Sequence, residues 1–156
     1  MPSHYEIDSI DRRILALLIE DAKMPYTEVA KRVMVSGGTV HVRMNKLEEM
    51  GLVKGATLKI DYAKLGYDIS AFLGVYLEKS SLSDKVVAAL RLIPEIISIH
   101  YTTGTYSLFC KMVCKDTNHL RQVLHDKIQL VEGIGRTETL IVLEETLDRS
   151  VQLDTE

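Results

Sequence analysis

Hydrophobic positions at the start of the chain recur at helical spacing. The steps along the chain are four, three and one residues between Ile10, Ile14, Leu17 and Leu18, which places these side chains on one face of a helix. Asp8 stands just before this run, where its carboxylate can cap the first turn. The pattern therefore predicts an amphipathic helix that begins just after Asp8.

Two further helices are predicted after a break at residues 23–25. A short helix is expected over Tyr26–Val33, with Pro25 suited to its first turn. A third helix is expected from about residue 37 to residue 50, and Gly51 is a natural stop after it. Its inward-facing positions are Val40, Met44 and Leu47. Two short strands, Leu52–Val53 and Ala56–Ile60, are expected to form a wing after this helix.

The period changes from helical to alternating in the second half of the chain. The predicted order is strand, helix, two strands joined by a tight turn at Gly104, helix and strand, which is the split ferredoxin-like arrangement. The strands are expected over residues 71–78, 96–103, 106–114 and 137–147, and the helices over 83–92 and 117–127. The fold class is therefore α+β, with a winged helix-turn-helix over residues 1–56, a connector over 57–68 and a ferredoxin-like domain over 69–156.

Composition narrows the classes of function. The net charge is −3, but residues 1–56 carry equal numbers of basic and acidic groups, so a DNA-binding head remains compatible with it. The sequence has no apolar run long enough to span a membrane and no leader pattern, so a cytoplasmic location is expected. Cys110 and Cys114 would lie roughly 13 Å apart along a strand, too far to pair, and two reduced thiols are expected. The five histidines lack the spacing of metal ligands, and no nucleophile–base pair is evident, so neither an enzyme nor a cofactor is expected.

The third helix is the candidate DNA reader. Three helices with a short turn between the last two match the helix-turn-helix plan, in which the later helix enters the major groove. Ser36 is placed to cap this helix and meet a phosphate, outward-facing Val42 suits a thymine methyl, and Arg43 and Lys46 can reach phosphates or a guanine. The predicted DNA-binding residues are Ser36, Gly38, Thr39, His41, Val42, Arg43 and Lys46. The alternative is an ordinary three-helix bundle with a solvated polar face, in which Arg43 pairs with an acidic neighbour.

Several segments, in order and spacing, resemble the Lrp/AsnC (feast/famine) family of regulators. In the head these are residues 10–15 (Ile-Asp-Arg-Arg-Ile-Leu), residues 26–30 and residues 35–43, which include His41-Val42-Arg43. In the second half they are residues 65–67, residues 101–107 (Tyr-Thr-Thr-Gly-Thr-Tyr-Ser) and residues 136–143. The resemblance covers residues 6–147 and is closest to the asparagine-responsive branch of the family.

The resemblance implies a hinge strand within residues 57–68 and, over 69–156, the domain known as RAM (regulation of amino acid metabolism). It also implies dimers formed through the sheet of that domain, further assembly into rings, with an octamer expected, and a small amino acid bound between dimers. The ligand-binding residues that it implies are Tyr101, Thr103, Gly104, Tyr106 and Ser107, with Thr137, Glu138 and Thr139 from a neighbouring dimer.

Gly104 permits close backbone approach, the hydroxyls can bind polar groups of the ligand, and Glu138 could meet its ammonium. Many members have an aspartate where this chain has Ser107, so a polar ligand such as asparagine is favoured. Without the resemblance, Gly104 would be interpreted only as a turn residue of a hairpin, and Tyr101 and Tyr106 as side chains that pack on the sheet.

Two functions are compared. The first is a sequence-specific DNA-binding transcriptional regulator that senses a small amino acid, asparagine being favoured. The second is a mainly architectural, nucleoid-type DNA-binding protein without a physiological ligand. Both predict binding of double-stranded DNA that weakens with salt, because phosphate contacts release counterions. Binding of an amino acid to the isolated protein distinguishes them.

Overall fold

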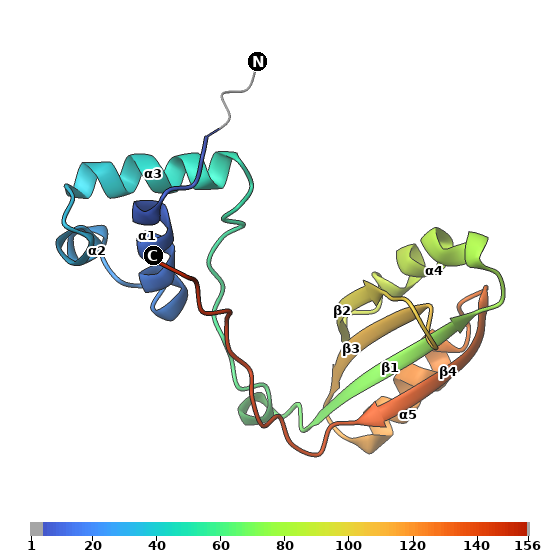
Figure 1. The fold of residues 1–156 in the computed structure, drawn as a ribbon. Coiled ribbons are helices and arrows are strands. Elements are labelled where there is room, and N and C mark those ends of the chain that lie inside the picture. Colours follow the sequence, from blue (N-terminus) through green and yellow to red (C-terminus); the bar gives the residue numbers. More distant parts are fainter. Residues whose placement is uncertain (1–4, 156) are drawn as a thin grey trace. The chain divides into compact units, whose positions relative to one another are not determined.

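The computed structural model describes residues 5–155, which divide into two compact units (Figure 1). Residues 5–59 and 147–155 make one unit, and residues 60–146 make the other. The first unit contains three helices, α1 (Ser9–Glu20), α2 (Tyr26–Val33) and α3 (Gly37–Glu49). The second contains β1 (Ile69–Leu77), α4 (Ser83–Leu90), β2 (Ile96–Tyr101), β3 (Leu108–Cys114), α5 (Thr117–Val123) and β4 (Ile134–Ile141), with 3₁₀ turns at Ala63–Leu65 and Ser80–Leu82 and a π-helical turn at Leu124–Ile128. The predicted α+β fold class is confirmed.

The three-helix unit is held by a small apolar core to which each helix contributes. Its fully or almost fully buried side chains are Ile14, Val29, Ala30, Val33, Val40, Met44 and Leu47. Asp8 caps α1 by accepting from the backbone N–H of Asp11 at 2.9 Å, and the Asp11 carboxylate accepts from the backbone N–H of Asp8 at 3.1 Å. This reciprocal capping box satisfies donors at the start of the helix that have no intrahelical partner. The predicted cap and the predicted inward face of α3 are confirmed.

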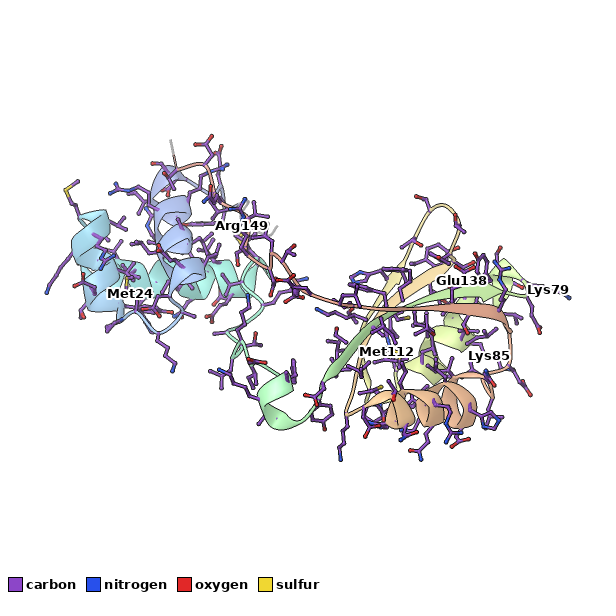
Figure 2. All side chains as sticks on the ribbon, turned by 90° about the horizontal axis from the view of Figure 1, so that it is seen from below. Met24, Lys79, Lys85, Met112, Glu138 and Arg149 are labelled. Atoms are coloured by element: carbon purple, nitrogen blue, oxygen red, sulfur yellow. The ribbon has the colours of Figure 1, made fainter. Side chains whose placement is uncertain are left out.

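The second unit is an antiparallel sheet of order β2-β3-β1-β4 with both helices on one face (Figure 1). Alternate residues of β1 and β3 point toward the helices and join the core with α4 and α5. Figure 2 shows Met112 of β3 on this helix side and Glu138 of β4 on the other side of the sheet. No helix of this unit covers that second face, which is called the open face from here on.

The two strands expected for the wing are not formed in the single chain. Residues 52–60 contain no paired strands, and the backbone N–H groups of Leu52 and Val53 donate instead to the carbonyl of Leu47 at the end of α3. Gly55 has a φ of +132°, which differs from the conformation that a two-residue hairpin turn requires. The hinge strand expected within residues 57–68 is likewise absent, and the 3₁₀ turn Ala63–Leu65 is the only regular element of this segment.

Three predicted element ends are also corrected. The last strand stops at Ile141 instead of residue 147, because its partner β1 begins at Ile69 and the final ladder bond is from Val142 to the Ser70 carbonyl. The helix over 83–92 ends at Leu90, shortly before Pro94. The helix over 117–127 is regular only to Val123 and continues as the π-helical turn.

Candidate DNA-binding surface and ligand site

The recognition helix α3 begins with a fixed cap. Ser36 Oγ accepts from the backbone N–H of Thr39 at 3.1 Å and lies 2.8 Å from the Thr39 hydroxyl, with which it shares a hydrogen bond. The two hydroxyls therefore form a bonded pair at the first turn of α3, which is exposed. The predicted cap at Ser36 is confirmed, and it places a polar pair where a helix start offers free backbone N–H groups.

One shallow concave surface gathers nearly all of the predicted DNA-binding residues. It has a volume of about 450 Å³ and is lined by Tyr5, Ser36, Gly38, Thr39, Val42, Arg43 and Lys46. Val42 is 53% exposed although it is apolar, as is expected of a side chain that contacts a thymine methyl. His41 is not among the lining residues, and its ring lies 5.9 Å from the ring of Tyr26 at the start of α2.

Arg43 is turned toward the start of α1. Its Nη1 donates to both carboxylate oxygens of Asp8 at 2.8 Å and to Asp11 Oδ1 at 2.9 Å. Asp11 is fully buried, and the Arg43 side chain is 21% exposed. These bonds raise the pKa of the Arg43 guanidinium above its ordinary value, Asp11 making the largest contribution. The geometry matches the alternative interpretation of Arg43, as the partner of an acidic neighbour.

Tyr5 completes this cluster and was missed by the sequence analysis. Its hydroxyl lies 2.9 and 2.8 Å from the two carboxylate oxygens of Asp11 and 3.3 Å from Arg43 Nη1. Its ring lies under the ammonium of Lys46, with Nζ 5.1 Å from the ring centroid. Tyr5 precedes the first periodic apolar residue, so no helical pattern could have drawn attention to it.

The candidate ligand turn, residues 102–107, joins β2 to β3. Gly104 has a φ of +103°, a left-handed conformation that favours glycine. The turn is closed by a hydrogen bond from Thr102 Oγ1 to the Tyr106 carbonyl at 2.7 Å. It is fastened to the sheet by a bond from the backbone N–H of Ser107 to the Val75 carbonyl at 2.9 Å. Thr103 and Gly104 are exposed, and Tyr101 is exposed beside them at the end of β2.

The three candidate ligand residues of β4 do not all lie on the same face of the sheet. Glu138 pairs with Gly74 and lies on the open face, whereas Thr137 and Thr139 pair with Val75 and Leu73, which face the helices. The Glu138 carboxylate is therefore separated from the two threonines by the plane of the sheet.

Glu138 already has partners in its own chain. Its carboxylate accepts from the hydroxyls of Tyr106 at 2.8 Å and Tyr76 at 3.1 Å, and it pairs with the guanidinium of Arg136 at 3.0 Å. The hydrogen bond from Tyr106, followed by that from Tyr76, lowers the pKa of Glu138 below its ordinary value. In the described chain the carboxylate thus fixes Tyr106 over the sheet.

Gly74 makes this arrangement possible. A Cβ at this position would lie 2.5 Å from atoms of the Tyr106 ring, so the ring covers a strand residue that must lack a side chain. Gly74, Tyr76 and Arg136 were missed by the sequence analysis. The available signal was Gly74 itself, because a glycine inside a strand often marks a close approach by another group.

A three-helix head with a capped, outward-facing recognition helix, joined to a ferredoxin-like sheet with an exposed turn, defines a ligand-responsive DNA-binding regulator. Comparison with known proteins agrees with this class. Residues 7–54 match the family model described as winged helix-turn-helix DNA-binding, and residues 70–152 match the Lrp/AsnC ligand binding domain. The chain belongs to the Lrp/AsnC family of transcriptional regulators, so the resemblance noted from the sequence is confirmed.

Similar proteins cover almost the same length. Regulatory protein AsnC of Haemophilus influenzae is 41% identical over 148 residues, which cover 95% of this chain and 99% of that protein. The solved structure of Escherichia coli AsnC is 38% identical, with a TM-score of 0.89 over 96% of this chain and 100% of that chain. The feast or famine regulatory protein of M. tuberculosis, solved in complex with L-methionine, is 27% identical, with a TM-score of 0.88 over 95% of this chain and 100% of that chain.

Within residues 5–155, no helix is both long and apolar enough to cross a membrane. The same residues contain no group of three or more histidine, cysteine, aspartate or glutamate side chains that could hold a metal ion.

Proposed function

We propose that this regulator reads its DNA site with the outward face of α3 and responds to a small polar amino acid, with asparagine favoured. The observation that carries the DNA half is the concave surface on α3, which gathers Ser36, Gly38, Thr39, Val42 and Lys46 on one face. Lys46 supplies phosphate contact and Val42 supplies apolar contact with a base. His41, which is outside this concave surface and beside Tyr26 of α2, is proposed as a further contact.

A substitution at Gly38 tests DNA binding without disturbing the fold. A Cβ at Gly38 would meet only Ser36 Oγ, at 3.9 Å, so the free protein has room for alanine. Gly38→Ala should leave the head folded, and more stable by up to about 1 kcal/mol, because glycine weakens a helix. If the DNA backbone approaches α3 here, the same change should weaken binding to a duplex obtained by selection from random DNA. Unchanged affinity would place the DNA elsewhere on the head.

The effector is proposed to bind at the exposed turn of residues 102–107, with Thr103, Gly104 and Ser107 as direct contacts. Tyr101, at the end of β2, would line the site beside the turn. Thr137 and Thr139 would complete it from a neighbouring dimer, and Glu138 would act through Tyr106. The complex of a relative with L-methionine and the match of residues 70–152 to a ligand binding domain support an amino-acid ligand. Ser107 in place of an aspartate favours a ligand with an uncharged polar side chain.

Calorimetry tests this assignment. Asparagine, aspartate, glutamine and methionine are titrated into the wild-type chain, Thr103→Ala and the control Thr117→Ala, whose position lies at the start of α5. Asparagine should bind the wild type and the control but bind Thr103→Ala more weakly. Absence of binding by every amino acid would favour the architectural, ligand-free function instead.

The open face of the sheet is proposed to form a homodimer, with further assembly to an octamer. Phe72 stacks on Phe109 with ring centroids 5.2 Å apart, and Phe109 stacks on Tyr106 at 5.7 Å. Leu140, which pairs with Phe72 and is 48% exposed, extends this apolar surface. A contiguous apolar patch on a sheet face is typical of a protein–protein contact.

Sedimentation velocity tests the dimer. Phe72→Glu should dissociate it, whereas the control Leu92→Glu, at an 84% exposed position outside the open face, should not. Equal sedimentation of the two variants would contradict the assignment.

As a DNA-binding regulator without a catalytic role, the protein is proposed to act in the cytoplasm.

A further inference from the structure

The segment before α1 lies against the recognition helix. Tyr5 lines the concave surface together with the residues of α3, although it lies outside the residues that match the helix-turn-helix family. Its ring is half-buried, and the ammonium of Lys46 lies 5.1 Å from the ring centroid, within the range of a cation–π contact. The surface that α3 presents to DNA therefore includes an aromatic ring from a different segment.

Tyr5 is held by the buried carboxylate of Asp11. The phenol donates its single proton to Asp11, whose two oxygens lie 2.9 and 2.8 Å away, and Arg43 Nη1 approaches the phenol oxygen at 3.3 Å. Arg43 binds Asp8 and Asp11 at the same time, so one guanidinium ties α3 to the cap of α1 and to Tyr5. Burial, together with the neighbouring Asp11 carboxylate, raises the pKa of Tyr5 above its ordinary value, which keeps this hydroxyl a donor.

This arrangement determines what each side chain can offer to DNA. The Tyr5 hydroxyl donates to the buried Asp11 carboxylate. Tyr5 therefore presents the carbon surface of its ring to DNA and has no free donor for a base edge. Arg43 is occupied by two carboxylates and would have to break those bonds to reach a phosphate. Lys46 keeps its ammonium at the surface, over the ring. An apolar ring next to a cation fits a deoxyribose next to its phosphate, and such contacts position a protein on a duplex without selecting sequence.

We propose that Tyr5 is part of the DNA-contacting surface, where its ring packs against the sugar–phosphate backbone beside Lys46, and that Arg43 is a positioning residue that clamps Tyr5 and α1 to the recognition helix. This inference rests on the proposed DNA binding by α3, and it extends the contact surface to a segment before the helix-turn-helix.

The test measures fluorescence anisotropy of the full chain with a selected duplex and with a duplex of unrelated sequence, over a series of salt concentrations. Tyr5→Ala should weaken binding to both duplexes by about the same factor, about fivefold if some 40 Å² of ring surface is buried. Tyr5→Phe, which keeps the ring but not the hydroxyl, should lose less. Unchanged binding of Tyr5→Ala to both duplexes would overturn the assignment of Tyr5.

The salt dependence separates positioning from phosphate contact. Lys46→Met should reduce the slope of log affinity against log salt by about one, as expected when one phosphate contact is lost. Arg43→Met should leave that slope at the wild-type value but lower the ratio of selected to unrelated affinity, because the recognition helix is no longer fixed. Arg13→Met is the matched control, since the Arg13 guanidinium bonds the Arg32 carbonyl at 3.1 Å and does not line the surface.

Arg43→Lys keeps the experiment decisive if Arg43→Met does not fold. A lysine retains the charge but cannot donate to Asp8, Asp11 and Tyr5 in the geometry of a guanidinium. Affinity and slope equal to those of the wild type would show that charge alone matters and would overturn the positioning role. A slope reduced in Arg43→Met as in Lys46→Met would do the same. Failure of the wild-type chain to bind any duplex would instead contradict the proposed function.

Discussion

Replacing Arg43 with methionine should destabilise the three-helix unit strongly. The change removes the guanidinium that pairs with Asp11 at 2.9 Å and leaves a fully buried carboxylate without a cation. Asp11 would retain only the Tyr5 hydroxyl and the backbone N–H of Asp8 as donors. Methionine can still pack its chain beside α1, so the main loss is electrostatic.

The expected cost is about 3 kcal/mol. Breaking a buried ion pair typically costs about 3–5 kcal/mol, because the remaining charge is desolvated and unpaired. The lower end applies here, since two neutral donors to Asp11 remain. The Arg43–Asp8 bond adds little, because the Asp8 side chain is 47% exposed and water screens the pair. In a unit of this size, the midpoint of thermal unfolding should fall by roughly 12 °C or more.

Hydrogen exchange read out by mass spectrometry, combined with thermal melts, tests this value. Peptides from α1 and α3 should lose protection in Arg43→Met while those from the sheet keep it, because the helices and the sheet belong to different compact units. The control is Arg13→Met, which removes an exposed hydrogen bond to the Arg32 carbonyl and should cost less than about 1 kcal/mol.

A double mutant isolates the cause. Asp11→Asn with Arg43→Met removes the buried charge together with its partner, so it should be more stable than the sum of the two single changes predicts, by at least about 1 kcal/mol. The reasoning is refuted if Arg43→Met is as stable as the Arg13→Met control, or if the two changes at residues 11 and 43 are additive.

Three other outcomes follow from the sheet unit. Gly74→Ala should displace the Tyr106 ring and destabilise this unit by about 1–3 kcal/mol, as a thermal melt can measure, and an unchanged melt would contradict the contact. The Tyr106–Glu138 hydrogen bond lowers the pKa of Glu138 and raises that of Tyr106. Its contribution should therefore persist from neutral pH until Glu138 is protonated, at a pH below the ordinary range of a glutamate, or until Tyr106 ionises, at a pH above the ordinary range of a tyrosine. NMR titration of the tyrosine ring would reveal both limits, and loss near pH 6 would exclude this hydrogen bond. Burial raises the pKa of Cys110 and Cys114 to about 11, so iodoacetamide should label them slowly at pH 8 and rapidly after unfolding, whereas equal rates would show that the core is open.

Local rules account for most of the predicted elements. The helix α2 begins at Tyr26 and ends at Val33 as predicted, and α3 begins at Gly37 after the predicted cap, because apolar spacing and capping act within a few residues. The errors occur where a distant partner decides the outcome. The last strand ends at Ile141 because β1 begins at Ile69, and the wing residues Leu52 and Val53 bond to α3.

The sequence by itself determined the family, the two-part organisation and the face of α3 that carries the candidate DNA contacts, since spacing and motif order are properties of the linear chain. Only the tertiary structure assigned the charged residues their partners. Arg43 has the chemistry of a DNA contact, but it lies between Asp8 and Asp11, and Tyr5 joins it. Glu138 has the chemistry of an ammonium ligand, but Tyr76 and Tyr106 bind it. A charged side chain takes the partner that the fold brings within hydrogen-bonding distance, and that distance is absent from the sequence.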